Sequence, residues 1–277
     1  MREIDINDLP KYSPWVARLL QLEHFQKQER NLTKIEAEYN KDKYAKLLDQ
    51  YEAKKFATAH EQRALERSSS QYEICVSRGN KLFITTPTDC QQIEDEMLVD
   101  ALADPISTAK TIVELGCGYG YNFAVLKERF ANRTWLGGEY SANAITLGNR
   151  LFSSDTDVSI TFFNWYDSEW PILENIKDTA LIFTRHSIEQ LPQARNILSA
   201  FAKYRDKITA VVHLEPVYEL TDNSTLGLMR RAYTHLNDYN IDLLSMVKHM
   251  GLNIRRIHYD IFGSNPLNPT SLISWQF

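Results

Sequence analysis

The spacing of apolar residues changes along the chain and marks its elements. Residues 11–67 repeat apolar side chains at steps of three and four among many Lys and Glu, a pattern that predicts helix. Runs at 72–76 and 81–85 flank Ser-Arg-Gly-Asn and predict a β-hairpin with a glycine turn. Residues 91–102 place their apolar side chains on one face, which predicts a further helix.

From residue 111 onward, short apolar runs alternate with helical segments. The predicted strands, in chain order, are 111–115, 134–139, 158–163, 179–184, 208–214, 253–262 and 271–277. The predicted helices are 121–131, 142–151, one within 188–204 and 226–250, the last broken near 237–240. Strands that alternate with helices indicate a doubly wound, mostly parallel sheet. The last two strands are joined by a loop and predict an antiparallel hairpin at one edge.

The predicted fold class is therefore α/β, with a mostly parallel seven-stranded sheet at 111–277 whose last strand is antiparallel. A hairpin with its connecting helix at 71–110 and a helical region at 1–70 precede it. The charged face of that helical region is interpreted as solvent exposed. The alternatives are a dimerisation arm, which would make the protein a homodimer through its N-terminal helices, and a lid over an active site.

The first strand of this sheet runs into a glycine-rich turn, Glu-Leu-Gly-Cys-Gly-Tyr-Gly at 114–120, and then directly into a helix. Glycines allow a tight turn and let a ligand approach the bare backbone. Strand, glycine turn and helix together open a nucleotide-binding unit. Cys117 has no base beside it in the turn and is interpreted as a small packing residue rather than a nucleophile.

Three residues distinguish the kind of nucleotide. A dinucleotide fingerprint needs a third glycine at position 121, where this chain has the bulky Tyr121, so a dehydrogenase is disfavoured. Glu114 would repel a pyrophosphate but favours a cationic ligand. Glu139 ends the second strand, 23 residues after Gly116, where an acid can take both hydroxyls of a ribose.

The turn closely resembles the first motif of the class I S-adenosylmethionine-dependent methyltransferases. Glu139 resembles the family's ribose acid, and the edge hairpin resembles its antiparallel last strand, so the resemblance covers about residues 111–277. It implies S-adenosyl-L-methionine as the cofactor, with Glu139 on the ribose hydroxyls. The residues that it implies beside the methionine and ribose parts are Glu114, Gly116, Cys117 and Gly118.

The resemblance also implies an adenine site in the loop after the third strand. There the family often has a carboxylate for the adenine amine, and in this chain Asn164 or Asp167 must serve. Trp165 or Tyr140 stacks on the ring; the alternative is that a loop aromatic merely fills a gap.

Candidate catalytic residues follow the fourth and fifth strands, because ligands bind at the carboxyl ends of a doubly wound sheet. An alcohol acceptor must lose a proton, and a histidine suits that task at neutral pH. His186 is the first candidate base, followed by His213 and Glu215; the alternative for His186 is a structural role. No metal site is expected from these three residues, because the Asp-rich cluster of metal-dependent methyltransferases is not visible.

Arg230, Arg231 and Tyr233 lie on the helix after the fifth strand, where methyltransferases often place acceptor-binding insertions. Arginines there can hold a phosphate or carboxylate. The alternative is an amphipathic surface helix whose arginines face solvent.

Composition narrows the partners and the location. The formal net charge of −5 speaks against nucleic acid, and no apolar run approaches the ~20 residues of a membrane span. The N-terminus lacks the apolar stretch of a signal peptide, and the three cysteines have no metal or Cys-x-x-Cys spacing. A cytoplasmic protein is therefore expected.

The function expected is methyl transfer to a small polar acceptor, at oxygen. A sugar or phosphorylated metabolite of surface-polysaccharide or natural-product biosynthesis would fit. An RNA or protein methyltransferase is the alternative, although the acidic balance speaks against RNA and an Asn-Pro-Pro-Tyr signature is absent after the fourth strand. A non-catalytic scaffold that binds the cofactor and acts through its helical N-terminus is a further alternative.

Overall fold

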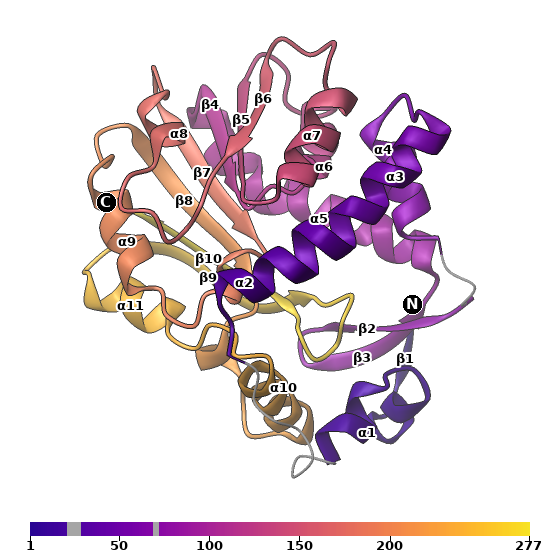
Figure 1. The fold of residues 1–277 in the computed structure, drawn as a ribbon. Coiled ribbons are helices and arrows are strands. Elements are labelled where there is room, and N and C mark those ends of the chain that lie inside the picture. The colour runs from indigo at the N-terminus through magenta and orange to yellow at the C-terminus, as the bar shows by residue number, and fades with distance from the viewer. Residues whose placement is uncertain (21–28, 69–71) are drawn as a thin grey trace.

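The computed structural model describes residues 1–20, 29–68 and 72–277. Within these ranges, seven strands form a central sheet in the order β6-β5-β4-β7-β8-β10-β9 (Figure 1). The first five in this order are parallel, whereas β10 is antiparallel to both β8 and β9. The bounds are β4 (Thr111–Leu115), β5 (Thr134–Glu139), β6 (Val158–Phe162), β7 (Ala180–Arg185), β8 (Ile208–Glu215), β9 (Asn253–Phe262) and β10 (Thr270–Gln276). The predicted fold class is confirmed.

Helices cover both faces of this sheet because successive side chains of the central strands enter two separate cores. Ile112 and Leu181 are fully buried on one face, and their chain neighbours Val113 and Ile182 are fully buried on the other. This double burial explains why the strands are almost continuously apolar. The first core is covered by α5 (Pro87–Thr108), α6 (Tyr121–Lys127) and α7 (Ala142–Leu151), the second by α8 (Pro171–Glu174), α9 (Arg195–Ala202) and α11 (Leu243–His249).

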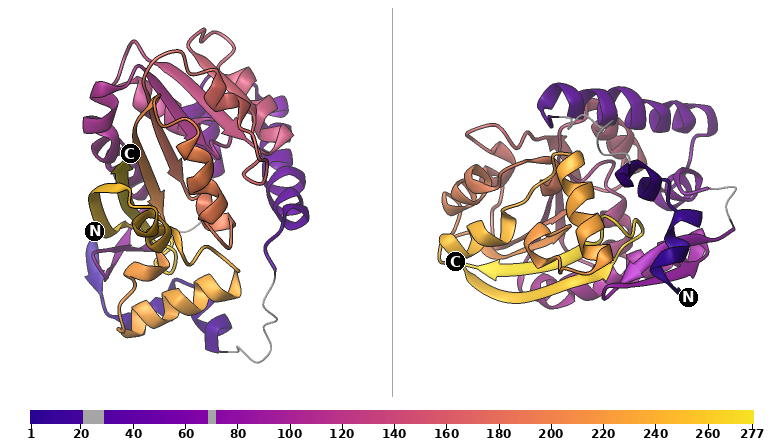
Figure 2. Two further views of the ribbon diagram at one scale, coloured as in Figure 1. Left: turned by 90° about the vertical axis from the view of Figure 1, so that its left-hand side faces the viewer. Right: turned by 90° about the horizontal axis from the view of Figure 1, so that it is seen from below.

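The N-terminal region is helical but interrupted. A 3₁₀-helix (Ile6–Lys11) and α1 (Trp15–Leu20) come first, and α4 (Ala59–Glu66) comes last. Between them, α2 (Leu32–Ile35), a π-helix (Glu36–Tyr44) and α3 (Ala45–Lys54) follow one another without a break, and we call this continuous segment the rod. The rod lies along the outside of the molecule in both views of Figure 2 and packs on α7. The part of the helix prediction at 21–28 lies outside the described residues.

A small antiparallel sheet stands beside the main one. The predicted hairpin is present as β2 (Ile74–Arg78) and β3 (Lys81–Thr85), and β1 (Arg2–Ile4), which the sequence pattern did not predict, pairs with β3. The bridge between Ser77 and Gly263 joins this sheet to the end of β9. None of the helices in the described ranges is long and apolar enough to cross a bilayer.

The buried side chain of Arg230, on α10 (Thr225–Leu236), connects the main sheet with the small sheet. Its side chain is 1% exposed and forms an ion pair of 2.8 Å with Asp260 of β9. It also donates to the Pro266 carbonyl at 2.8 Å and to Asn80 Oδ1, in the hairpin turn, at 2.7 Å. Arg230 is therefore a structural residue that connects α10, β9 and the small sheet.

Replacement of Arg230 by Gln should lower the free energy of unfolding by about 3–5 kcal/mol, because the buried carboxylate of Asp260 would lose its counter-charge. Chemical denaturation measures this loss. The matched control is Arg231→Gln, whose side chain bonds only Thr221 and Asn223 among the described hydrogen bonds and should cost about 1 kcal/mol or less. Equal losses in the two variants would contradict this account of Arg230.

Candidate active site

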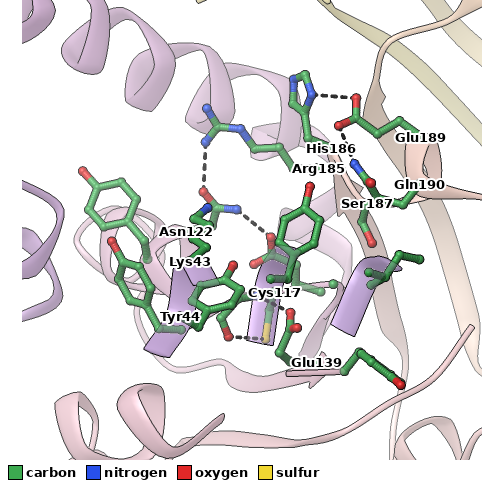
Figure 3. Close-up of a pocket in the computed structure, with 18 of the residues that line it drawn as sticks. Lys43, Tyr44, Cys117, Asn122, Glu139, Arg185, His186, Ser187, Glu189 and Gln190 are labelled. Atoms are coloured by element: carbon green, nitrogen blue, oxygen red, sulfur yellow. Dashed lines mark hydrogen bonds and ion pairs between the residues drawn. The ribbon is translucent and has the colours of Figure 1, made fainter. Parts of the chain in front are cut away.

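A cavity of about 580 Å³ lies at the carboxyl ends of β4, β5 and β7. Its walls come from the glycine turn, the end of β5, the loops after β6 and β7, the rod and α4 (Figure 3). The volume falls within the roughly 300–1,000 Å³ of small-molecule sites. The rod therefore forms one wall of this cavity.

The glycine turn has a backbone that other residues rarely adopt. Gly116, Gly118 and Gly120 have φ angles of +83°, +57° and +82°. A Cβ atom on Gly118 would also lie 2.5 Å from the hydroxyl oxygen of Tyr44, on the rod. The turn therefore needs glycine for its conformation and for the close approach of a neighbour.

Glu139 holds the turn in place at the end of β5. Its carboxylate accepts hydrogen bonds from the backbone N–H of Gly118 at 2.7 Å and of Ser141 at 2.8 Å. Burial raises the pKa of Glu139, and these two N–H donors act in the opposite direction. A carboxylate has about four acceptor positions, and the backbone of Tyr140 also acts on this one, so capacity remains for a further donor in the cavity.

The rod is attached to the same place through Asn40. Its side-chain oxygen accepts from Ser141 Oγ at 2.8 Å and from the backbone N–H of Asn143 at 3.0 Å. Ser141 is also the N-cap of α7, because its hydroxyl accepts from Ala144 N–H at 3.2 Å. Helix α7 thus begins at residue 142, as the sequence pattern predicted, and the rod binds directly to its N-cap.

Glu114 places an unsatisfied oxygen at the cavity. Its Oε1 accepts from Asn122 Nδ2 at 2.5 Å, whereas Oε2 is buried and has no hydrogen-bond partner among the described residues. Burial raises the pKa of Glu114 to about 8, against the effects of the Asn122 hydrogen bond and the Arg185 charge. A buried acceptor without a donor is costly, so this wall is suited to a ligand that brings positive charge or a donor.

His186 lies in the loop after β7 and also lines the cavity, with 32% of its side chain exposed. Its Nδ1 lies 3.1 Å from Glu189 Oε2, and its Nε2 lies 2.7 Å from Thr270 Oγ1. Burial opposes the charged imidazole, but the ion pair with Glu189 outweighs it, so the pKa of His186 is raised. The carboxylate also accepts from Asn268 Nδ2 at 2.8 Å, which fixes its position.

Glu215 and His213, the other candidate bases, lie outside the lining of this cavity. Glu215 accepts hydrogen bonds from the backbone N–H groups of Ser187, Ile188 and Glu189 at 3.0–3.2 Å, so it shapes the loop that carries His186. His213 is fully buried on β8, and burial lowers its pKa to about 3. The structure therefore gives both residues structural positions.

The acceptor candidates on α10 also lie away from the cavity. Arg230 is enclosed in the ion pair with Asp260, and Arg231 bonds the loop before α10. Tyr233 is buried against Trp15 of α1, with ring centroids 4.7 Å apart. The structure does not bring these three residues to the site.

Four basic residues that the sequence pattern did not single out line the cavity: Lys43, Arg63, Arg67 and Arg185. Three of them belong to the N-terminal helices, whose charges were interpreted as a solvent-exposed face. Lys and Arg are common on exposed helix faces, so the sequence contained no signal that would have singled them out.

The loop after β6 contributes Asn164 and Trp165 to the cavity, and Tyr140 lines it from the end of β5. Of the two candidate adenine partners, Asn164 lines the cavity and Asp167 does not; Asn164 Nδ2 donates to Asp167 at 2.9 Å. Trp165 donates from its indole N–H to Ser187 Oγ at 3.0 Å and packs edge-on against Phe163. These contacts hold the indole in one orientation at the wall.

No protein-family model matches the chain, and no curated protein matches it in sequence. Among solved structures it is similar to a geranyl diphosphate C-methyltransferase from Streptomyces coelicolor A3(2), solved with Mg²⁺, geranyl diphosphate and S-adenosyl-L-homocysteine. The two are 15% identical over 69% of this chain and 80% of that chain, with a TM-score of 0.49. A SAM-dependent methyltransferase from Aquifex aeolicus is 9% identical over 69% of this chain and 98% of that one, with a TM-score of 0.46.

An O-methyltransferase family protein from Burkholderia thailandensis is 13% identical over 69% of this chain and 58% of that one, with a TM-score of 0.46. All three are methyltransferases, the class that the glycine turn resembles. At such low identities and scores the similarity carries no conclusion about function, which has to come from the residues of the cavity.

The pairing of His186 with Glu189 is directly measurable. In an NMR titration of the imidazole, the pKa of His186 should lie above the usual ~6.5. Replacement of Glu189 by Gln should lower it, because burial would then act without this counter-charge. Replacement of the exposed Glu169 by Gln is the control and should leave the titration unchanged. An unaltered titration in the Glu189 variant would show that the ion pair does not set this pKa.

Proposed function

We propose that the protein is an S-adenosylmethionine-dependent methyltransferase that acts on a small polar acceptor, at oxygen. One observation carries the proposal. The glycine turn, the acid that binds it and the unsatisfied oxygen of Glu114 meet in one cavity of suitable size. Bare backbone, a ribose acid and a carboxyl group that can ionise beside a positive charge are what a nucleoside with a sulfonium group requires.

The residues of the cavity fit the cofactor part by part. The backbone at Gly116 and Gly118 would border its methionine and ribose, and the free acceptor positions of Glu139 would take the ribose hydroxyls. Trp165 and Asn164 would flank the adenine. When bound, S-adenosylmethionine supplies a methyl group activated by the sulfonium charge.

His186 is the proposed general base. Its Nε2 would exchange the Thr270 hydroxyl for the acceptor hydroxyl and take up the proton of that hydroxyl. Glu189 holds the opposite ring nitrogen and stabilises the imidazolium that results. Glu215 acts indirectly: it accepts hydrogen bonds from N–H groups of the loop after β7 and so positions His186. The rod covers the turn and reduces the access of water to the site.

The proposed location of the enzyme is the cytoplasm. All three cysteines are unpaired and buried, which is compatible with a reducing compartment. The partner is a small molecule.

Isothermal titration with S-adenosylmethionine and with S-adenosylhomocysteine tests the proposal. Both should bind, and Glu139→Ala should weaken both at least about tenfold because the ribose loses its acceptors. Glu169→Gln, at the surface, is the control. Transfer of labelled methyl groups to a panel of small hydroxylated acceptors tests the reaction itself. A folded protein that binds neither nucleoside would refute the proposed function.

Glu114 provides a second test. At pH 7, below its raised pKa of about 8, this carboxyl group is mostly protonated in the free protein. A cationic ligand beside it lowers that pKa, so binding should release up to about one proton. Titration calorimetry in two buffers of different ionisation enthalpy measures the release at pH 7. Glu114→Gln should abolish most of it, and equal proton release in this variant would rule out Glu114 as the group that meets the positive charge.

A further inference from the structure

Four cationic side chains gather on one wall of the cavity. Lys43 comes from the rod, Arg63 and Arg67 from α4 and the residue after it, and Arg185 from the end of β7. The side chains of Arg63 and Arg185 are only 15% and 8% exposed. Buried guanidinium groups are costly unless they are paired, so their counter-charges decide what this wall can bind.

The first counter-charge is Glu66, on α4. Its carboxylate is 2.8 Å from Arg63 and 3.4 Å from Lys43, and it also accepts from the Tyr119 hydroxyl at 3.0 Å. The pKa of Glu66 is lowered to about 2: burial acts against the charge, but Lys43 and Arg63 outweigh it. Glu66 is thus shared between two cations.

The second counter-charge is Glu94, on α5, and three arginines share it. Its carboxylate is 2.7 Å from Arg67, 3.6 Å from Arg185 and 3.8 Å from Arg63. Only the contact with Arg67 is short enough for a hydrogen bond. Arg185 uses its other nitrogen to donate to Asn122 Oδ1 at 2.9 Å, so part of its donor fork remains available.

The cations on this wall outnumber the carboxylates that they contact directly. Among the described residues in direct contact, four cations face two carboxylates. The next acids are Asp95, held by Tyr121 and Gln91, and Glu139, whose charge acts on Lys43. Glu114 reaches Arg185 only through Asn122 and is mostly protonated at pH 7.

The other carboxylates of the cavity, Glu139 and Glu189, have their own partners. Glu139 accepts from backbone N–H groups, and Glu189 is paired with His186. The cavity therefore has an acidic side beside the glycine turn and a basic side at the arginines.

We infer that the acceptor carries a carboxylate or phosphate group, which Arg63, Arg67 and Arg185 bind. This inference rests on the proposed function. Guanidinium forks match the oxygens of both anions, and such a ligand would accept from the donors that the shared carboxylate of Glu94 leaves available. Arg185 directly precedes His186 at the end of β7, and the two side chains leave the chain at adjacent positions (Figure 3). An anion held there places the remainder of the acceptor beside the proposed base.

Inorganic phosphate is a direct probe of this wall. The quantity to measure is the melting temperature of the protein saturated with S-adenosylhomocysteine as phosphate is added. The ionic strength is held constant with chloride. Phosphate should stabilise the protein in a saturable manner, and Arg67→Gln should weaken its binding at least about fivefold. Arg67 is the most exposed of the three arginines and the safest to replace, with circular dichroism as the check of folding. Arg205→Gln, at the surface, is the control.

The absence of saturable stabilisation, or equal stabilisation of the Arg67 and Arg205 variants, would overturn the inference. The alternative occupant of this wall is the carboxylate in the amino-acid part of the cofactor. A second measurement distinguishes it from the acceptor. If the arginines bind the acceptor, Arg67→Gln should change the affinity for S-adenosylhomocysteine less than twofold. A large loss of that affinity, with unchanged affinity for 5′-methylthioadenosine, would assign the wall to the cofactor carboxylate and overturn the inference.

Binding of S-adenosylhomocysteine to the unaltered protein tests the proposed methyl transfer independently of the anionic acceptor. Phosphate binding at Arg67 without nucleoside binding would contradict the proposed methyl transfer. Nucleoside binding without phosphate binding would contradict the anionic acceptor alone.

Discussion

The carboxylate of Glu139 joins the end of β5, the glycine turn and the start of α7, because it accepts from Gly118 and Ser141 at the same time. A buried carboxylate is stable only when such donors surround it, so these three parts must take their places together. Ser141 extends the connection to the rod through Asn40. The rest of the site is built beside this junction: β4, the neighbour of β5 in the sheet, brings Glu114, and β7, the next strand beyond β4, brings Arg185 and His186.

The rod covers the carboxyl ends of the strands and so encloses the site. Tyr44 lies against Gly118, and Tyr39 and Lys43 face the same cavity, so a ligand at the glycine turn lies beneath the rod. These residues belong to a nine-residue π-helix, a geometry that is rare and often found at functional sites. Enclosure strengthens the charges that face one another across the cavity, since less water screens them. The acidic side at Glu114 and the basic side at Arg185 therefore act on different parts of what binds.

Much of the fold was predictable because its signals are local. The glycine turn, the helix that begins at residue 142 and the apolar runs of the strands are each contained in a few neighbouring residues, and the structure has them where the pattern placed them. The directions of side chains were not predictable in this way. His186 and Glu215 both follow apolar strands, but which one lines the cavity depends on how the loop after β7 folds over Glu215. Arg230 is enclosed in an ion pair and Arg63 lines the cavity because contacts distant in sequence, with Asp260 and Glu94, fix them.

A crystal structure with S-adenosylhomocysteine bound tests the central claim, that the turn and Glu139 form a site for this cofactor, most directly. We expect the ribose hydroxyls within hydrogen-bond distance of Glu139, the sulfur beside the backbone of Gly116, and the open side of the sulfur facing Arg185 and His186. A product molecule bound away from Glu139, or a glycine turn that stays covered by Tyr44 at saturating ligand, would contradict the account.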